Sequence, residues 1–126
     1  AILCAAVADY RPQEQASEKM KRGTDMFTLS LVPNKDIAAS LGQIKKASQI
    51  LIGFALETND EESNALKKMA KKNLDYIVLN SLQDKGAGFQ YDTNKVSIIC
   101  KDGTKKDFAL KSKKEVASDI INETLS

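Results

Sequence analysis

The sequence predicts an α/β protein in which helices cover both faces of a mostly parallel sheet. Short apolar runs alternate along the chain with segments of helical spacing, which is typical of parallel strands joined by helical crossovers. The first run, residues 2–7, has no polar alternation and is followed by Asp9. Such a run is typical of a strand covered on both faces. Near the C-terminal end, Asp102-Gly103 is a strong β-hairpin turn signal.

Six segments are predicted as strands from their apolar content and from the turn residues that bound them. They are residues 2–7, 27–32, 49–55, 76–80, 95–100 and 106–110, of which the last two form the hairpin. The expected architecture is a Rossmann-like three-layer sandwich, with a mostly parallel sheet and an antiparallel C-terminal hairpin.

Three helices are predicted between and after these strands. Asn34 or Asp36 can cap the first, and basic residues follow in its last turn. Asn59 or Asp60 can cap the second, over residues 61–73. The third covers residues 113–125. Its apolar stripe is Val116, Ile120, Ile121 and Thr124.

The length of the chain, residues 1–126, is that of one domain or part of one, and it is long enough to bury a core. The net charge of +2 does not by itself indicate a nucleic-acid partner, and no apolar stretch has the length of a membrane span. The absence of histidine excludes a Ser-His-Asp triad and removes the usual zinc ligand. Cys4 and Cys100 lack a metal or redox spacing, so we interpret them as small buried residues in a reducing compartment.

Four places could carry chemistry, and each also has a simpler structural explanation. The first is Asp9, with Arg11 and Lys19 further on. Asp9 follows the first strand, at the edge where open parallel sheets bind their ligands. All three residues could equally be solvated loop charges.

The second and third places lie beside later strands. Residues 33–37 turn from a strand into a helix, and the free N–H groups of a helix start can bind a phosphate or a carbonyl edge. An ordinary helix cap is the simpler explanation. At the third place, Gly53 permits a close approach and Phe54 can stack on a base, unless Phe54 is a core aromatic.

The fourth place is the lysine cluster of the second helix: Lys67, Lys68, Lys71 and Lys72. Lys68 and Lys72 are four residues apart, so their ammonium groups can converge on one polyanion. A solvated helix face is the simpler explanation. Helical periodicity places the apolar side on the opposite face, with Leu66, Met69, Ala70 and Asn73.

Taken in order, these segments resemble the phosphopantothenoylcysteine synthetase family, also called phosphopantothenate–cysteine ligase. The matching stretches are AAVADYRP at 5–12, EKMK at 18–21, NKDI at 34–37, GFALET at 53–58, Lys68 with KKNLD at 71–75, LN at 79–80, and GF at 88–89 with Asp92 and Asn94. The resemblance runs from residue 1 to about residue 125 with compatible spacings. Several motifs in one order are far more specific than any single motif.

The resemblance implies a ligase of coenzyme A biosynthesis that joins phosphopantothenate to cysteine through an amide bond. In such a mechanism the substrate carboxylate attacks the α-phosphate of CTP or ATP, and pyrophosphate leaves. The cysteine amine then attacks the acyl-nucleotide. The resemblance further implies Mg²⁺ with the nucleotide, no flavin in this portion, a cytoplasmic location and a homodimer of the full protein.

The resemblance also assigns roles to individual residues. Lys19 would be the catalytic residue that stabilises charge during transfer. Lys68 and Lys72 would hold the triphosphate. The complete implied nucleotide site is Leu3, Cys4, Ala5, Asp9, Lys19, Asn34, Lys35, Asp36, Ile37, Ala38, Phe54, Lys68 and Lys72.

The chain also departs from the family pattern. Lys35 stands where proline is usual, which adds a charge beside the base, and Ser81 replaces a common acid, so Asn80 is given no role. The N-terminal half that handles phosphopantothenate in the family has no counterpart here, so we expect the chain to be the C-terminal part of a larger ligase domain and incomplete as a catalyst. Two alternatives stay open: a non-catalytic nucleotide-binding module, and a basic domain that binds nucleic acid through residues 67–72.

Overall fold

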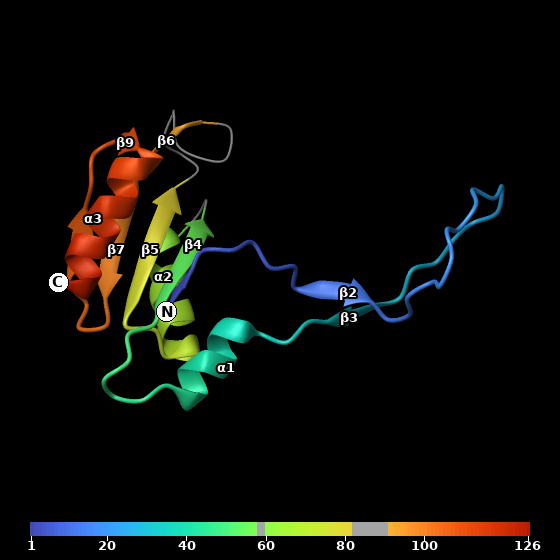
Figure 1. Cartoon of the computed structure of the whole chain (residues 1–126), viewed down its shortest axis with the longest axis horizontal. Coiled ribbons are helices and arrows are strands. Elements are labelled where there is room, and N and C mark those ends of the chain that lie inside the picture. Colours follow the sequence, from blue (N-terminus) through green and yellow to red (C-terminus); the bar gives the residue numbers. More distant parts are fainter. Residues whose placement is uncertain (58–59, 82–90) are drawn as a thin grey trace.

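A computed structural model describes residues 1–57, 60–81 and 91–126 and places a five-stranded sheet at the centre of the chain (Figure 1). The strand order is β1-β4-β5-β7-β8. The first three strands are parallel, and β5, β7 and β8 pair antiparallel. This confirms the predicted α/β class. The strands are β1 Ile2–Leu3, β4 Ile52–Glu57, β5 Tyr76–Ser81, β7 Val96–Cys100 and β8 Lys105–Asp107.

Helices cover both faces of the sheet and make the three predicted layers. On one face, α2 (Glu61–Lys72) buries Ala65 and Met69 against a cluster that includes Ile77. On the other face, α3 (Lys113–Leu125) buries Val116 and Ile120 in a second cluster. Helix α1 (Ile37–Ile44) packs beside α2. No helix in the described part of the chain combines the length and apolarity needed to cross a membrane.

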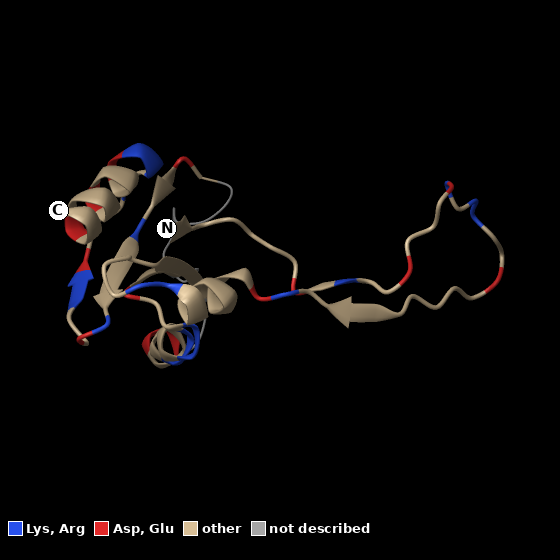
Figure 2. Cartoon of the chain, turned by 60° about the horizontal axis from the view of Figure 1, so that its bottom comes forward, with Lys and Arg blue, Asp and Glu red and all other residues tan. Residues whose placement is uncertain are grey.

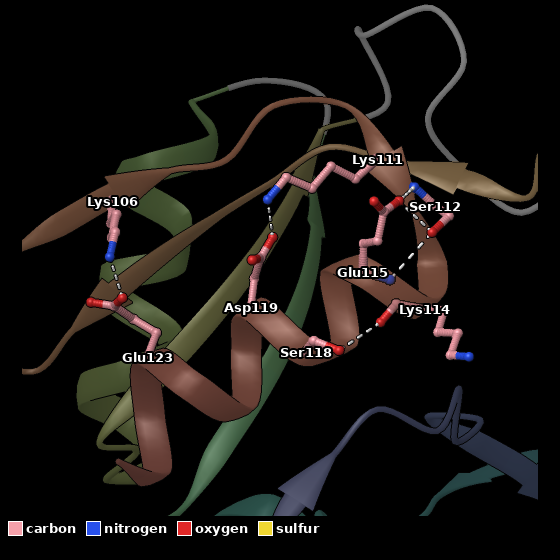
Figure 3. A network of polar contacts seen from close by, with 8 residues as sticks. All are labelled: Lys106, Lys111, Ser112, Lys114, Glu115, Ser118, Asp119 and Glu123. Atoms are coloured by element: carbon pink, nitrogen blue, oxygen red, sulfur yellow. Dashed lines mark hydrogen bonds and ion pairs between the residues drawn. The ribbon is translucent and has the colours of Figure 1, made fainter.

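Helix α3 spans the predicted residues and begins with a capping box. The Ser112 side chain accepts a hydrogen bond from the Glu115 backbone N–H, and the Glu115 carboxylate accepts one from the Ser112 backbone N–H (Figure 3). These reciprocal bonds satisfy two donors at the helix start. An ion pair of 2.7 Å between Lys111 and Asp119 also holds this helix to the strand before it. In the predicted stripe, Val116, Ile120 and Thr124 are buried, whereas Ile121 is 45% exposed.

The C-terminal hairpin is confirmed. β7 pairs with β8, and Gly103 in the connecting turn has a φ of +90°, a conformation that glycine adopts without strain. Two short strands that the sequence did not indicate, β6 (Thr93–Asn94) and β9 (Lys111–Ser112), pair beside this hairpin. The glycine-rich stretch at residues 85–89 lies outside the described residues.

The N-terminal third differs most from the prediction. The expected strand 2–7 is reduced to β1, an edge strand with one neighbour, and residues 4–9 are exposed. The expected strand 27–32 does not join the sheet. Instead β2 (Tyr10–Pro12) and β3 (Leu31–Pro33) form an antiparallel ribbon that projects away from the sheet, with residues 13–30 at its far end (Figure 1). The apolar character of these two segments predicted that they are buried. In the structure the first segment lines a cavity and the second belongs to the exposed ribbon.

The buried face of α2 also differs from the predicted one. Ala65 and Met69 are buried, while Leu66 is 41% exposed and Ala70 is exposed. The helix is therefore rotated relative to the predicted apolar stripe. Lys68 and Lys72 consequently share the side of the helix that carries Ala65 and Met69, since side chains three and four residues apart lie on one face.

Helices α1 and α2 cross at very short range. A Cβ atom added at Gly42 of α1 would lie 1.9 Å from the Lys72 carbonyl oxygen, so only glycine fits there. The Asn73 side chain donates a 2.8 Å hydrogen bond to the Gly42 carbonyl at the same place.

The C-terminal end of α1 is fastened separately. Asp75 accepts a 2.5 Å hydrogen bond from Lys45 and a 2.7 Å bond from the Leu51 backbone N–H. Burial acts to raise the pKa of Asp75, but these bonds and the charge of Lys45 outweigh it and hold the pKa below its ordinary value. The two attachments fix where the first turn of α1 lies.

We predict that Gly42→Ala destabilises the chain. Alanine raises helix propensity by about 1 kcal/mol, but contact with a backbone carbonyl cannot be relieved by rotating a side chain, and overpacking costs about 1–3 kcal/mol. A 1.9 Å contact with a backbone atom belongs at the upper end of that range, so the expected net loss in urea unfolding is about 2 kcal/mol. In the control Gly23→Ala, the new Cβ meets its nearest atom at 3.9 Å, so stability should stay within about 0.5 kcal/mol. A Gly42→Ala variant as stable as the parent chain would contradict this packing.

Candidate functional site

A cavity of about 400 Å³ lies where the segment after β1, the start of α1, strand β4 and helix α2 meet. This is the carboxyl end of the edge strand, the place where open α/β sheets bind ligands. Every residue of the site expected from the sequence lines this cavity, with the exception of Lys19. These residues are Leu3, Cys4, Ala5, Asp9, Asn34, Lys35, Asp36, Ile37, Ala38, Phe54, Lys68 and Lys72.

The chain after β1 forms one wall of the cavity. Because β1 ends at Leu3, residues 4–9 leave the sheet as an exposed segment. Cys4 lies in this segment, so the expectation of a buried cysteine in a strand is wrong at this position. Cys100 lies at the end of β7 and is partly buried. Both cysteines are free thiols.

Asn34 joins that wall to the turn before α1. Its side-chain amide nitrogen donates to the Ala8 carbonyl at 2.7 Å, and its backbone N–H donates to the Asp9 carbonyl at 2.7 Å. The Arg11 guanidinium donates to the Asn34 amide oxygen at 3.1 Å and to the Pro33 carbonyl at 3.0 Å. Because both ends of the Asn34 side chain are engaged, it acts as a clamp that shapes the cavity.

The start of α1 faces the cavity through Asp36, Ile37 and Ala38. Asp36 is the N-cap, and its side chain accepts a 3.0 Å hydrogen bond from the Ala39 backbone N–H. Its second oxygen lies 3.2 Å from the Lys72 ammonium group. The hydrogen bond from the Ala39 N–H is the largest influence on the pKa of Asp36, and together with the charge of Lys72 it holds that pKa below its ordinary value although burial acts to raise it. The carboxylate is therefore charged at neutral pH.

Lysines and one aromatic ring supply the opposite side. Lys68 and Lys72 reach the cavity from α2, which carries much of the basic charge near it (Figure 2). Phe54 lines the cavity from β4 and is 38% exposed, so it is not a core aromatic. Gly53 has a packing role, because a Cβ there would lie 2.6 Å from a methyl carbon of Leu74.

The structure does not bring Lys19 to the cavity. Lys19 belongs to residues 13–30, the exposed far end of the ribbon, and lies outside the described cavity lining. Figure 2 shows acidic and basic residues interspersed along this far end of the ribbon. The charge of Lys19 is therefore remote from the other predicted site residues in this arrangement.

Asn80 is a candidate site residue that the sequence analysis left without a role. It lies at the carboxyl end of β5, opposite Leu56 of β4. Its amide oxygen is buried and has no hydrogen-bond partner among the described residues. Buried polar atoms are nearly always paired, so such an atom at the ligand edge of a sheet is informative. A polar residue ending an apolar strand is the sequence signal that could have found it.

The fold and the cavity define a Rossmann-like α/β domain with a ligand-sized cavity at the edge of its parallel strands. The chain belongs to the family described as the DNA/pantothenate metabolism flavoprotein C-terminal domain, whose model matches residues 1–126. This confirms the family assignment made from the ordered motifs.

Individual curated proteins are similar to the chain over nearly all of its length. The chain is 48% identical over 122 residues to the coenzyme A biosynthesis bifunctional protein CoaBC of Bacillus subtilis, covering 97% of the chain and 30% of that protein. It is 53% identical over 126 residues to a cysteine/cysteine sulfinic acid decarboxylase of an unknown prokaryotic organism, covering 100% of the chain and 35% of that protein. The chain thus spans about a third of these curated relatives.

Solved structures confirm the fold. A crystal structure of the C-terminal domain of a coenzyme A biosynthesis bifunctional protein CoaBC matches with a TM-score of 0.72 and 40% identity, over 97% of this chain and 52% of that one. A DNA/pantothenate metabolism flavoprotein from Streptococcus pneumoniae matches with a TM-score of 0.71 at 20% identity, over 97% of this chain and 60% of that one. The second match bears on the fold alone.

We predict that Asn34→Ala loosens the wall of the cavity. The substitution removes the bonds to Ala8 and from Arg11, each worth about 1 kcal/mol. Hydrogen exchange at the backbone amide of position 34, which donates to Asp9, should become roughly 5-fold faster or more. Binding of a ligand that occupies the cavity should weaken in the same variant. Weaker binding with unchanged exchange would instead identify Asn34 as a direct ligand contact.

Proposed function

We propose that this chain supplies the nucleoside-triphosphate side of a phosphopantothenate–cysteine ligase of coenzyme A biosynthesis. The observation that carries the proposal is one cavity that gathers nearly all the residues of the implied site, from four separate segments. The family and the CoaBC relatives support the same general role. Because the chain spans about a third of those relatives, we propose the complete reaction for the longer protein.

In this proposal the nucleotide lies along the cavity from Phe54 to the lysines of α2. Phe54 offers an exposed ring face on which a base can stack. Leu3 and Ala5 line the same cavity, and Lys35 adds a positive charge there. Lys68 and Lys72 hold the triphosphate as point charges. CTP and ATP are both compatible with this arrangement.

The proposed chemistry needs positioning and charge stabilisation from this chain. The phosphopantothenate carboxylate attacks the α-phosphate, the bond to pyrophosphate breaks, and the cysteine amine then displaces the nucleotide to form the amide. Preorganised positive charge is the main aid that a protein gives to transfer at phosphorus. For Lys19 to act as the catalytic residue, residues 13–30 must move to the cavity or reach that of another copy. We assign no flavin role to this chain.

Magnesium fits the cavity as a partner of the nucleotide. The described residues contain no group of three His, Cys, Asp or Glu side chains that could hold a metal ion. Mg²⁺ commonly binds through phosphate oxygens and waters with one or two carboxylates, and Asp9 is a cavity carboxylate suited to that role. Bound there, the ion would offset the negative charge of the phosphates.

We also propose that the ribbon is the contact surface for a second copy of the chain. Its apolar side chains are unusually exposed, with Phe27 at 66% and Leu29 and Leu31 at 53% each. Apolar groups clustered on an exposed surface indicate an interaction site. A two-stranded ribbon also presents free strand edges for pairing. We propose a homodimer on this basis, with a cytoplasmic location as expected for such an enzyme.

We predict that Lys68→Ala weakens binding of CTP or ATP, whichever the chain prefers, by about 10-fold in isothermal titration with Mg²⁺, because one charged phosphate contact is lost. Lys67→Ala is the matched control. Lys67 has the same charge on the same helix and is exposed like Lys68, but it lies outside the described cavity lining. Its affinity should change by less than about 2-fold. Equal effects of the two substitutions would indicate nonspecific charge attraction, and tight oligonucleotide binding would favour the nucleic-acid alternative.

We predict that Phe27→Ser weakens self-association, measured by sedimentation over a range of concentrations. Removing one large exposed apolar contact should raise the dissociation constant by roughly 10-fold. Ile44→Ser is the control, because Ile44 is 75% exposed but lies on α1, away from the ribbon. A monomeric parent chain, or equal effects of both variants, would count against the ribbon as the contact surface.

A further inference from the structure

The charges of the cavity do not simply add up to an anion-binding site. Three lysines line it, Lys35, Lys68 and Lys72, together with two acids, Asp9 and Asp36. A carboxylate inside a polyphosphate site repels the ligand by ordinary electrostatics. Of these two acids, Asp36 makes a hydrogen bond and an ion pair in the cavity. Its effect on anion binding can therefore be inferred from the geometry.

The two carboxylate oxygens of Asp36 contact two different positively charged or hydrogen-bond-donating groups. One oxygen accepts the Ala39 N–H at 3.0 Å, which satisfies a donor at the positive end of α1. The other lies 3.2 Å from the Lys72 ammonium group. A free phosphate at this place would seek the same two partners. The Asp36 carboxylate therefore stands where a phosphate group would bind.

Asp36 and Lys72 lie close together because the backbones of α1 and α2 are fixed against each other, and not because their ion pair is strong. Asp36 is fixed as the N-cap of α1, and the Gly42 crossing fixes α1 against the carbonyl of Lys72. The ion pair is also partly open to solvent, with side chains 29% and 43% exposed. Such pairs contribute little stability, so a ligand of higher charge can take Lys72 from Asp36.

We propose that Asp36 is an internal competitor for Lys72 that weakens the hold of the cavity on polyphosphate. This inference rests on the proposed function, in which pyrophosphate must leave before the amide can form. A nucleoside triphosphate has its base and sugar to add to its affinity, whereas pyrophosphate has only its charge. Competition from Asp36 lowers the affinity of both ligands by the same factor, but the base and sugar still hold the substrate, whereas pyrophosphate is left with weak binding and can leave. In this account Asp36 acts on polyphosphate affinity through its pairing with Lys72.

The test compares the binding of pyrophosphate and inorganic tripolyphosphate to the whole chain by calorimetry at fixed ionic strength. Asp36→Asn removes the charge but keeps an amide oxygen that can cap α1, because asparagine is as good an N-cap as aspartate. We expect both ligands to bind roughly 3- to 10-fold more tightly to this variant. Adding Lys72→Met should abolish that gain, whereas adding Lys71→Met, on the exposed neighbouring lysine, should preserve it.

Two further variants keep the comparison clean. Asp25→Asn makes the same change of net charge at the far end of the ribbon and should alter pyrophosphate affinity by less than about 2-fold. Asp36→Ser keeps a capping oxygen and gives a second test if asparagine disturbs α1, whose helix content is checked by circular dichroism. Both Asp36 variants should change affinity in the same direction.

Unchanged or weaker pyrophosphate binding in the folded Asp36 variants would overturn the proposal and make Asp36 a residue that positions Lys72. The same conclusion holds if the gain survives Lys72→Met. Failure of the proposed function looks different: neither CTP nor ATP would bind the parent chain, whatever the result with pyrophosphate. The two ideas can therefore fail separately.

Discussion

The close crossing of α1 and α2 at Gly42 is the constraint on which the site depends. It brings the start of α1, the lysines of α2 and the edge of the sheet around one cavity. The Asn73 bond to Gly42 and the bonds of Asp75 hold both ends of that contact. Backbone contacts of this kind have two consequences. They tolerate no larger residue, and they allow a half-buried charge such as Lys72 to be placed accurately without a strong ion pair.

The site has a second support, at the base of the ribbon. Arg11 and Asn34 connect the two ribbon strands with the wall that follows β1, through bonds of 2.7–3.1 Å. The surface proposed to meet a second copy is thus bonded directly to the wall of the proposed nucleotide cavity. A partner that orders the ribbon would also order that wall, because the same residues belong to both.

Much of the sheet and its last helix could be predicted from the sequence. Strands β4, β5 and β7 are apolar runs, and α3 has an apolar stripe and a clear N-cap. The ribbon could not, because Phe27 and the apolar run before Asp9 have the composition of buried strands but serve an exposed surface and a cavity wall. The site residues were predicted from the order of the motifs. Helical periodicity was a poorer guide, because it predicted the wrong buried face for α2. Their bonds were not predictable: no pattern shows that Asn34 is fully engaged, or that Asp36 lies beside Lys72.

A crystal structure of the chain with Mg²⁺ and CTP, or with ATP in its place, tests the central claim most directly. The account predicts a nucleotide in the cavity between Phe54 and the lysines of α2, with phosphate oxygens within hydrogen-bond distance of Lys68. The Lys72 ammonium group should then have turned from Asp36 towards the phosphates. A nucleotide bound elsewhere, or one whose phosphates lie away from α2, would contradict the account.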